Sequence, residues 1–272
     1  MAEVRNAPGT QPLTPGKAGL GVTQRQDPWW AEWLGTVVGL GILGVYAFVA
    51  AEMGKGQWGP YLSPFYSPEF LQLPKLFHVA TLPAGIPIAL IPLVVILGFR
   101  GTCYYYRKAY YRAFFADPAG CAVGEARTDY AGETRWPWLI QNAHRYFMYL
   151  ATIALIFLWF DTVVAFFPGV GGHSEFGSVN FGLGSFVMLL NVILLSGYTF
   201  GCHSLRHLIG GKNDCMSCEP SRLAGWKAAS KFNAKHMQWA WASLFWVCAT
   251  DLYIRLGGLG YLQHVEKWGG WH

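Results

Sequence analysis

The stretch FGLGSFVMLLNVILLSGYTF, which runs from Phe181 to Phe200, decides the fold of this chain. It contains no Asp, Glu, Lys or Arg, and a helix of this length crosses roughly 30 Å of hydrocarbon. The residues that follow, GCHSLRH, place two histidines and an arginine directly after the apolar run. An uncharged run that ends in basic residues is typical of a transmembrane helix leaving the membrane.

Apolar blocks of this kind occur four more times. Only 13% of the residues are charged, whereas about 25% is usual in a soluble globular protein. The four further blocks are Trp33–Ala51, Thr81–Phe99, Tyr146–Phe167 and Met237–Tyr253. The sequence therefore predicts an all-α polytopic membrane protein with five transmembrane helices.

The distribution of Lys and Arg predicts the orientation. Seven lie in residues 100–145 and six in residues 201–236, and such residues collect on the cytoplasmic side. We therefore expect a multi-pass protein of the plasma membrane, with a cytoplasmic N-terminus and an external C-terminus. The net charge of +5 then needs no nucleic-acid partner, although it suits contact with membrane lipid.

Three regions follow from this topology. Residues 1–28 have too few apolar side chains to fold alone, so they are expected to be a cytoplasmic tail, disordered or bound to a partner. Residues 29–256 form the membrane domain, and residues 257–272 form an external tail. All cysteines except Cys248 lie at or beyond the cytoplasmic face, where structural disulfides are not expected.

A short internal repeat brings four metal-ligand types to one depth. Cys103 and Cys202 end the second and fourth predicted helices, and an arginine follows each of them four residues later. His144 and His236 open the third and fifth helices, in QNAHRYFMY and FNAKHMQWAW. Two thiolates and two imidazoles suit either zinc or a Rieske-type [2Fe–2S] cluster. Four of the five helices would then form a bundle that holds a cofactor.

Other interpretations of these residues stay open. His144 and His236 are also suited to be the axial ligands of a b-type haem, and a non-redox transporter with a structural zinc would use the same donors. His203 and His207, four residues apart on one helix face, are the alternative imidazole pair. The CMSC motif has zinc-ligand spacing, but it is only half of a four-ligand site, so it stays unassigned.

The run CYYYRKAYYRAFF, from Cys103 to Phe115, follows the second predicted helix. Such a run forms an interfacial aromatic belt, or it lines a pocket for the head group of a quinone, whose carbonyl oxygens need hydrogen-bond donors. The sequence places a quinone near Tyr106 and Arg107, together with Trp226 at the approach to the fifth helix.

Several long motifs carry a family resemblance. RGTCYYYRKAYYRAFF, GETRWPWLIQNAHRYFMY, YTFGCHSLRHLIGG and FNAKHMQWAWASL resemble the membrane anchor subunit of actinobacterial succinate dehydrogenases, over roughly residues 30–256. The resemblance implies a subunit of succinate:quinone oxidoreductase, respiratory complex II, that passes electrons from an iron–sulfur subunit to a quinone. It has no succinate chemistry of its own.

The resemblance also implies partners and a cofactor. The partners are a flavoprotein subunit and an iron–sulfur subunit on the cytoplasmic face. A higher oligomer of the whole complex is compatible with this arrangement. The expected quinone is menaquinone. One branch of the family has a membrane-embedded Rieske-type [2Fe–2S] cluster in place of haem b, and the absence of histidine from the interior of the first predicted helix favours that branch.

Overall fold

The computed structural model describes residues 19–54, 56–68, 90–125, 132–136, 138–173, 177–262 and 264. Apart from one two-stranded antiparallel hairpin, the regular secondary structure of these residues is helical, so the predicted all-α class is confirmed. The α-helices are α1 (Ala31–Glu52), α3 (Leu90–Thr102), α4 (Tyr104–Phe115), α5 (His144–Phe166), α6 (Leu183–Phe200), α7 (His203–Gly210), α8 (Pro220–Ala234) and α9 (His236–Gly258). The strands are β1 (Gln57–Trp58) and β2 (Tyr61–Leu62), and the short 3-10 helices are η1 (Pro64–Tyr66), η3 (Gly132–Thr134), η4 (Trp138–Ala143), η5 (Pro168–Gly171) and η6 (Met216–Cys218).

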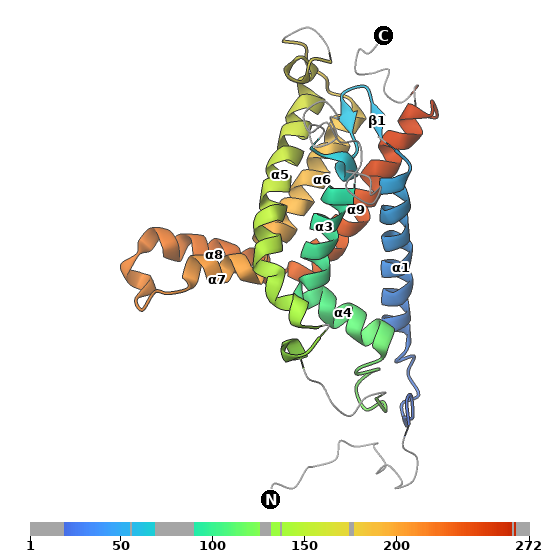
Figure 1. Cartoon of the computed structure of the whole chain (residues 1–272), viewed down its shortest axis with the longest axis vertical. Coiled ribbons are helices and arrows are strands. Elements are labelled where there is room, and N and C mark those ends of the chain that lie inside the picture. The colour runs from blue at the N-terminus through green and yellow to red at the C-terminus, as the bar shows by residue number, and fades with distance from the viewer. Residues whose placement is uncertain are drawn as a thin grey trace, which may run out of the picture.

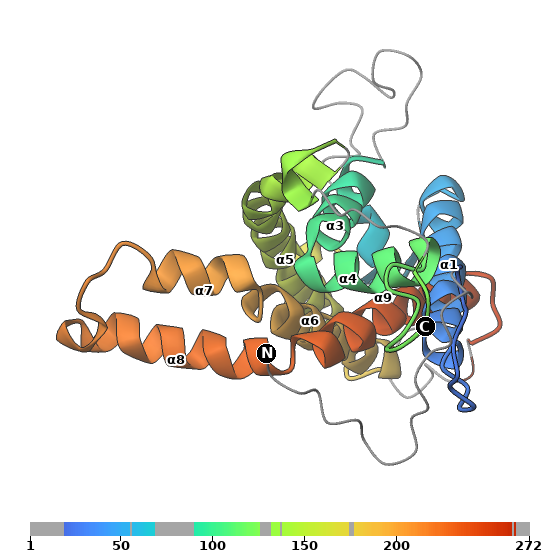
Figure 2. The same cartoon turned by 90° about the horizontal axis from the view of Figure 1, so that it is seen from below.

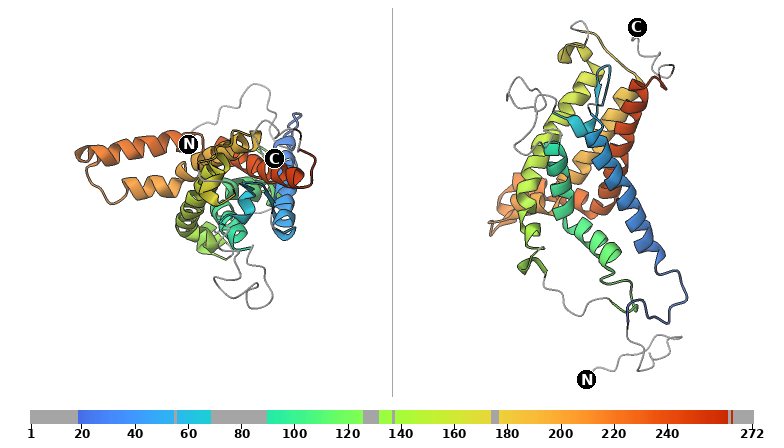
Figure 3. Two further views of the ribbon diagram at one scale, coloured as in Figure 1. Left: turned by 90° about the horizontal axis from the view of Figure 1, so that it is seen from above. Right: turned by 45° about the vertical axis from the view of Figure 1, so that its right-hand side comes forward.

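Five helices form the bundle. α6 packs between α5 and α9, α3 packs on α5, and α1 closes the opposite side against α9 (Figure 1; Figure 3, right). α4 lies across the end of the bundle where α3 finishes (Figure 1). α3 and α6 finish at this end, and α1, α5 and α9 begin there (Figure 1). We call it the Cys–His end.

Three helices of the described chain are long and apolar enough to cross a membrane. They are Ala31–Glu52, Trp138–Phe166 and Leu183–Phe200. The apolar part of α3 is shorter, and the predicted span that contains it begins at Thr81, outside the described residues. Asp251 and Arg255 lower the hydropathy of α9. For α3 and α9, a membrane crossing therefore stays a prediction.

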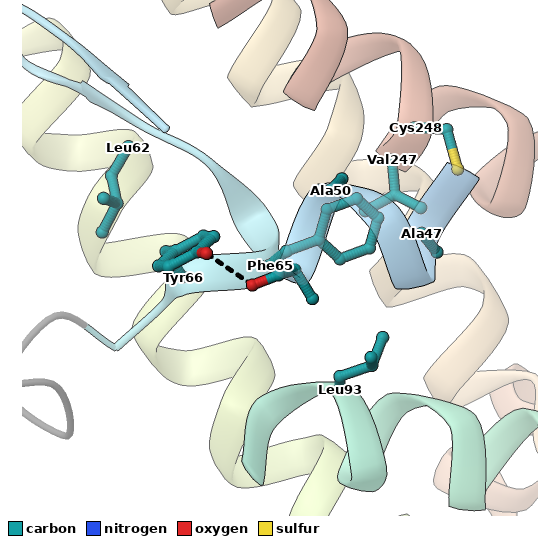
Figure 4. Close-up of a cluster of buried hydrophobic side chains, with 9 residues drawn as sticks. Ala47, Ala50, Leu62, Phe65, Tyr66, Leu93, Val247 and Cys248 are labelled. Atoms are coloured by element: carbon teal, nitrogen blue, oxygen red, sulfur yellow. Dashed lines mark hydrogen bonds between the residues drawn. The ribbon is translucent and has the colours of Figure 1, made fainter. Parts of the chain in front are cut away.

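Small residues allow the β1–β2 hairpin and η1 to insert between the helices. Ala47 and Ala50 of α1 leave room for Phe65, which is 1% exposed and packs with Val247 of α9 (Figure 4). The hydroxyl of Tyr66 donates a hydrogen bond of 2.5 Å to the carbonyl oxygen of Ala51 (Figure 4). The end of the bundle opposite the Cys–His end is therefore closed by chain that runs back into the core.

A buried carboxylate joins three segments at this closed end. Asp251 of α9 is fully buried and accepts hydrogen bonds from the hydroxyls of Ser63 and Tyr46, the latter at 2.7 Å. Arg255 Nε donates to the same carboxylate at 2.9 Å, and Arg255 Nη2 donates to the carbonyl oxygen of Ala50 at 2.6 Å. The carboxylate therefore ties α9 to α1 and to the segment that precedes η1.

Replacing Asp251 with alanine is expected to lower the free energy of unfolding by about 3–5 kcal/mol, because it leaves the mostly buried guanidinium of Arg255 without its counter-charge. Thermal unfolding of the purified assembly, followed by circular dichroism, measures the loss. The matched control is Asp27→Ala, which breaks a solvent-exposed pair with Arg25 and should leave the transition unchanged. An unchanged transition in both variants would show that the buried pair does not support the fold.

Two segments extend the Cys–His end. α7 and α8 form a helical hairpin that projects sideways from the bundle (Figure 2; Figure 3, left). In addition, residues 19–28 of the predicted tail follow the loop after α4, and Gly21 and Gly124 are joined by a backbone hydrogen bond of 3.0 Å. Arg25 Nη1 donates to the carbonyl oxygen of Cys121 at 2.8 Å. This part of the tail therefore contacts the chain itself, and residues 1–18 lie outside the described residues.

Candidate metal centre and adjoining cavity

Cys103 and Cys202 occupy matching breaks between helices. Each is the residue before a new helix, with φ −64° and ψ 131° at Cys103 and φ −64° and ψ 136° at Cys202. Their side chains are 3% and 1% exposed. Because this extended backbone interrupts the helix, each thiol faces into the bundle while the chain turns away along α4 or α7. The two predicted repeat segments have the same local geometry.

Each thiol is paired with the imidazole of a different helix. Cys103 Sγ lies 3.4 Å from His236 Nε2, and Cys202 Sγ lies 3.1 Å from His144 Nε2. The pairs therefore join α3 to α9 and α6 to α5. Four donors from four helices meet at the Cys–His end, as two thiol–imidazole pairs.

Aromatic rings hold the imidazoles in an arrangement that repeats. The ring of Phe99 stacks on His144 with centroids 5.1 Å apart and an interplanar angle of 3°. The ring of Tyr198 stacks on His236 at 5.0 Å and 19°. Phe99 lies four residues before Cys103, and Tyr198 lies four residues before Cys202. The internal repeat therefore includes the aromatic residue one helical turn before each cysteine.

Thr102 fixes the tautomer of His144. The Thr102 hydroxyl donates its one proton to the carbonyl oxygen of Gly98 at 2.6 Å, so at 2.9 Å from His144 Nδ1 it must accept. His144 Nδ1 then carries the ring proton, and the lone pair of Nε2 faces Cys202. A metal-binding imidazole needs this arrangement, with its outer nitrogen protonated and held by a neighbouring oxygen.

The chemistry of the four donors fits a two-metal group. Burial raises the pKa of the Cys202 thiol to about 11, so a bound cation is needed to hold it as a thiolate at neutral pH. Nδ1 of His236 is buried and has no hydrogen-bond partner among the described residues. Within the same residues, no three His, Cys, Asp or Glu side chains are grouped closely enough to share one ion. Two thiols and two imidazoles are also the donor set of a Rieske-type [2Fe–2S] cluster, which takes both thiolates on one iron and both imidazoles on the other.

A cavity of about 810 Å³ opens beside the donors. Its volume is typical of a site for a small molecule. Its lining includes three of the four donors together with polar and aromatic side chains: Thr102, Cys103, Tyr104, Tyr105, Glu133, Gln141, Asn142, His144, Arg145, Tyr146, His203, Ser204, Asn233 and His236. The sequence did not predict most of the residues that line this cavity, apart from the proposed ligands. What could have indicated some of them is their position beside a predicted ligand in the sequence, as in QNAHR around His144.

The residues predicted to bind quinone occupy three different places. Tyr106 points into the bundle, where its hydroxyl donates to the carbonyl oxygen of Ala240 at 2.7 Å. Arg107 forms an ion pair with Glu133, which lines the cavity. Trp226 lies on the projecting α8, where Arg206 covers its indole ring at 4.9 Å. None of the three is among the residues that line the cavity.

The alternative ligands and the remaining cysteines lie further out. The rings of His203 and His207 are 4.2 Å apart on α7, and His203 reaches the cavity wall. Cys215 and Cys218 form a disulfide at the tip of the projecting hairpin, with their Cα atoms 5.4 Å apart. The expectation of no disulfide was therefore wrong for this pair. The η6 turn brings the two sulfurs together whatever the compartment.

Comparison with known proteins identifies the family. Residues 31–260 match the sequence profile of the actinobacterial succinate dehydrogenase subunit SdhC. The chain belongs to this family. Among solved structures it is similar to a chain of the Mycobacterium smegmatis Sdh1 complex in the apo form, with 42% sequence identity and a TM-score of 0.77. The similarity covers 88% of this chain and 91% of the other. Among curated proteins, none matches the chain.

The chain is therefore a membrane subunit of succinate dehydrogenase, complex II. The family match spans most of the described residues, including all four donors. The prediction of an enzyme subunit is confirmed. The Rieske-type branch and the cofactor stay predictions.

Proposed function

We propose that this subunit carries electrons from the soluble part of succinate dehydrogenase to a membrane quinone through a [2Fe–2S] cluster of the Rieske type. Cys103 and Cys202 would hold one iron, and His144 and His236 the other. The cluster, when bound, supplies a one-electron relay. The chain supplies buried thiolates, imidazoles of fixed orientation and a cavity next to them.

The convergence of the four donors carries this proposal. They come from four helices far apart in sequence, and they are matched in backbone geometry and in ring stacking. Bringing two thiols and two imidazoles into the interior of an apolar bundle is costly unless they bind something. A structural zinc would instead gather all four donors around one point. An axial haem pair would leave both Nε2 atoms free to face each other, whereas each faces a thiol.

The cavity is the proposed site of the quinone head group. It contains donors suited to carbonyl oxygens, such as the amide of Asn142 and the guanidinium of Arg145. It also reaches His144 and His236, so an electron has only a short distance to travel from the proposed cluster. The proposed site is next to the aromatic run of α4, and Tyr106, Arg107 and Trp226 do not line it. Menaquinone is the expected substrate.

The proposal includes topology and partners. α1, α3, α5, α6 and α9 cross the membrane, with the Cys–His end at the cytoplasmic face, because the two basic segments lie there. The related chain is part of the Mycobacterium smegmatis Sdh1 complex. By analogy, the iron–sulfur and flavoprotein subunits dock at the cytoplasmic face.

The purified complex tests the nature of the centre. After reduction, electron paramagnetic resonance should give an iron–sulfur signal that disappears in the Cys103→Ser, Cys202→Ser double variant. Serine keeps the size of the side chain but removes the soft sulfur ligand. The soluble subunits carry iron–sulfur signals of their own, so the decisive quantity is the difference between the two spectra. A difference spectrum without such a signal, or a Soret band from haem, would contradict the proposal.

A further inference from the structure

A buried arginine without a carboxylate partner lies next to the metal centre. Arg100, in the last turn of α3, is 6% exposed. None of the ion pairs in the described part of the chain involves it. Removing a guanidinium from water is expensive, and a charged side chain inside a membrane domain usually has a functional reason.

The partners of Arg100 are neutral. Nη1 donates to the Tyr106 hydroxyl at 2.6 Å and to the carbonyl oxygen of Ala240 at 3.1 Å. Nη2 donates to Ser243 Oγ at 2.9 Å. These hydrogen bonds fix the guanidinium in place, but they leave its positive charge uncancelled.

The charge is directed toward one of the imidazole donors through an aromatic ring. Cζ of Arg100 lies 4.6 Å from the ring centroid of Tyr198. The same ring stacks on the imidazole of His236, with centroids 5.0 Å apart, and it also contacts the rings of Phe99 and Tyr106. The Tyr198 ring therefore contacts both the guanidinium of Arg100 and the imidazole of a proposed ligand.

Arg100 is badly placed to bind a substrate. It does not line the cavity of about 810 Å³. The space that it does line, between α3, α5 and α6, holds about 40 Å³. That volume admits a water molecule but is far too small for a quinone head group.

We propose that Arg100 is a positioning residue whose fixed charge favours the reduced form of the iron–sulfur centre. The inference rests on the proposed function. With two thiolate ligands the oxidised centre has no net charge, and the electron that it receives from the partner iron–sulfur subunit makes it an anion. A nearby cation in a medium of low dielectric stabilises that anion and raises the reduction potential. The electron then passes to the quinone. The charge of Arg100 therefore changes the reduction potential of the centre but not the stoichiometry of the reaction.

Substituting Ser243 tests the charge without removing Arg100. In Ser243→Asp, a carboxylate meets Nη2 and cancels the charge, whereas Ser243→Asn is a neutral control of the same size. An anaerobic redox titration of the whole complex, followed by electron paramagnetic resonance, measures the potential. We expect S243D to lower the equilibrium constant for reduction at least tenfold, about 59 mV for one electron. S243N should stay close to wild type.

A second pair of variants covers a failure of S243D to assemble. Arg100→Gln removes the charge and Arg100→Lys retains it, so the potential should fall in R100Q and be largely preserved in R100K. Lys231→Gln, which removes an exposed charge on α8, should have no effect. Equal shifts in R100Q and R100K, or in S243D and S243N, would make the role merely structural and overturn the proposal. A wild-type complex without the membrane iron–sulfur signal would instead refute the proposed function.

Discussion

Replacing both His144 and His236 with alanine is expected to abolish quinone reduction by the complex, while succinate oxidation with a soluble dye continues. Each imidazole presents Nε2 to a thiol within 3.4 Å, so the double variant removes one half of the proposed ligand set and leaves both thiols without an imidazole partner. The expected loss is at least a hundredfold in quinone-linked turnover. The membrane iron–sulfur signal should disappear with it.

The matched control for this prediction uses the alternative imidazoles. His203 and His207 contact each other on α7, and neither has a hydrogen bond to Cys103 or Cys202 among the described residues. The His203→Ala, His207→Ala double variant should therefore keep the iron–sulfur signal. Loss of that signal in the control, with retention in the His144 and His236 variant, would exchange the two pairs as ligands.

Helix periodicity explains why the ligand region could be read from the sequence. Cys103 and Cys202 end apolar runs, and His144 and His236 begin them, so counting residues brings all four to one end of the bundle. Counting residues could not predict which thiol contacts which imidazole. Cys103 faces His236 and not His144, which is nearer in the sequence, because α3 and α9 meet through tertiary packing between residues 133 positions apart.

The closed end of the bundle shows the same division between local and distant contacts. Asp251 and Arg255 are four residues apart on one helix, so their ion pair was an available interpretation of the sequence. The other partners of Asp251, Tyr46 and Ser63, are 205 and 188 residues away, and no periodic pattern indicates them. Likewise, the sequence predicted residues 201–236 as a basic cytoplasmic segment but not as a helical hairpin, because neither α7 nor α8 is apolar enough to resemble a span.

Replacing Asn142 with tryptophan is expected to raise the KM for quinone at least tenfold. Asn142 is exposed at the rim of the cavity of about 810 Å³, on the short helix η4 that leads into α5. An indole at this position would occupy the space through which a quinone ring enters. The cluster ligands are untouched, so a lower affinity for quinone should appear without any change in the iron–sulfur signal.

The control places the same indole outside the cavity. Ser221→Trp adds it to the exposed N-terminal turn of α8, where no residue lines the cavity, and the KM should stay at the wild-type value. Steady-state quinone reduction by the purified complex, at saturating succinate, measures both variants. The outcome also decides between two quinone sites. If Asn142→Trp has no effect and Trp226→Ala raises the KM, the quinone binds near Trp226, one of the three residues predicted from the sequence, and not in the cavity beside His144 and His236.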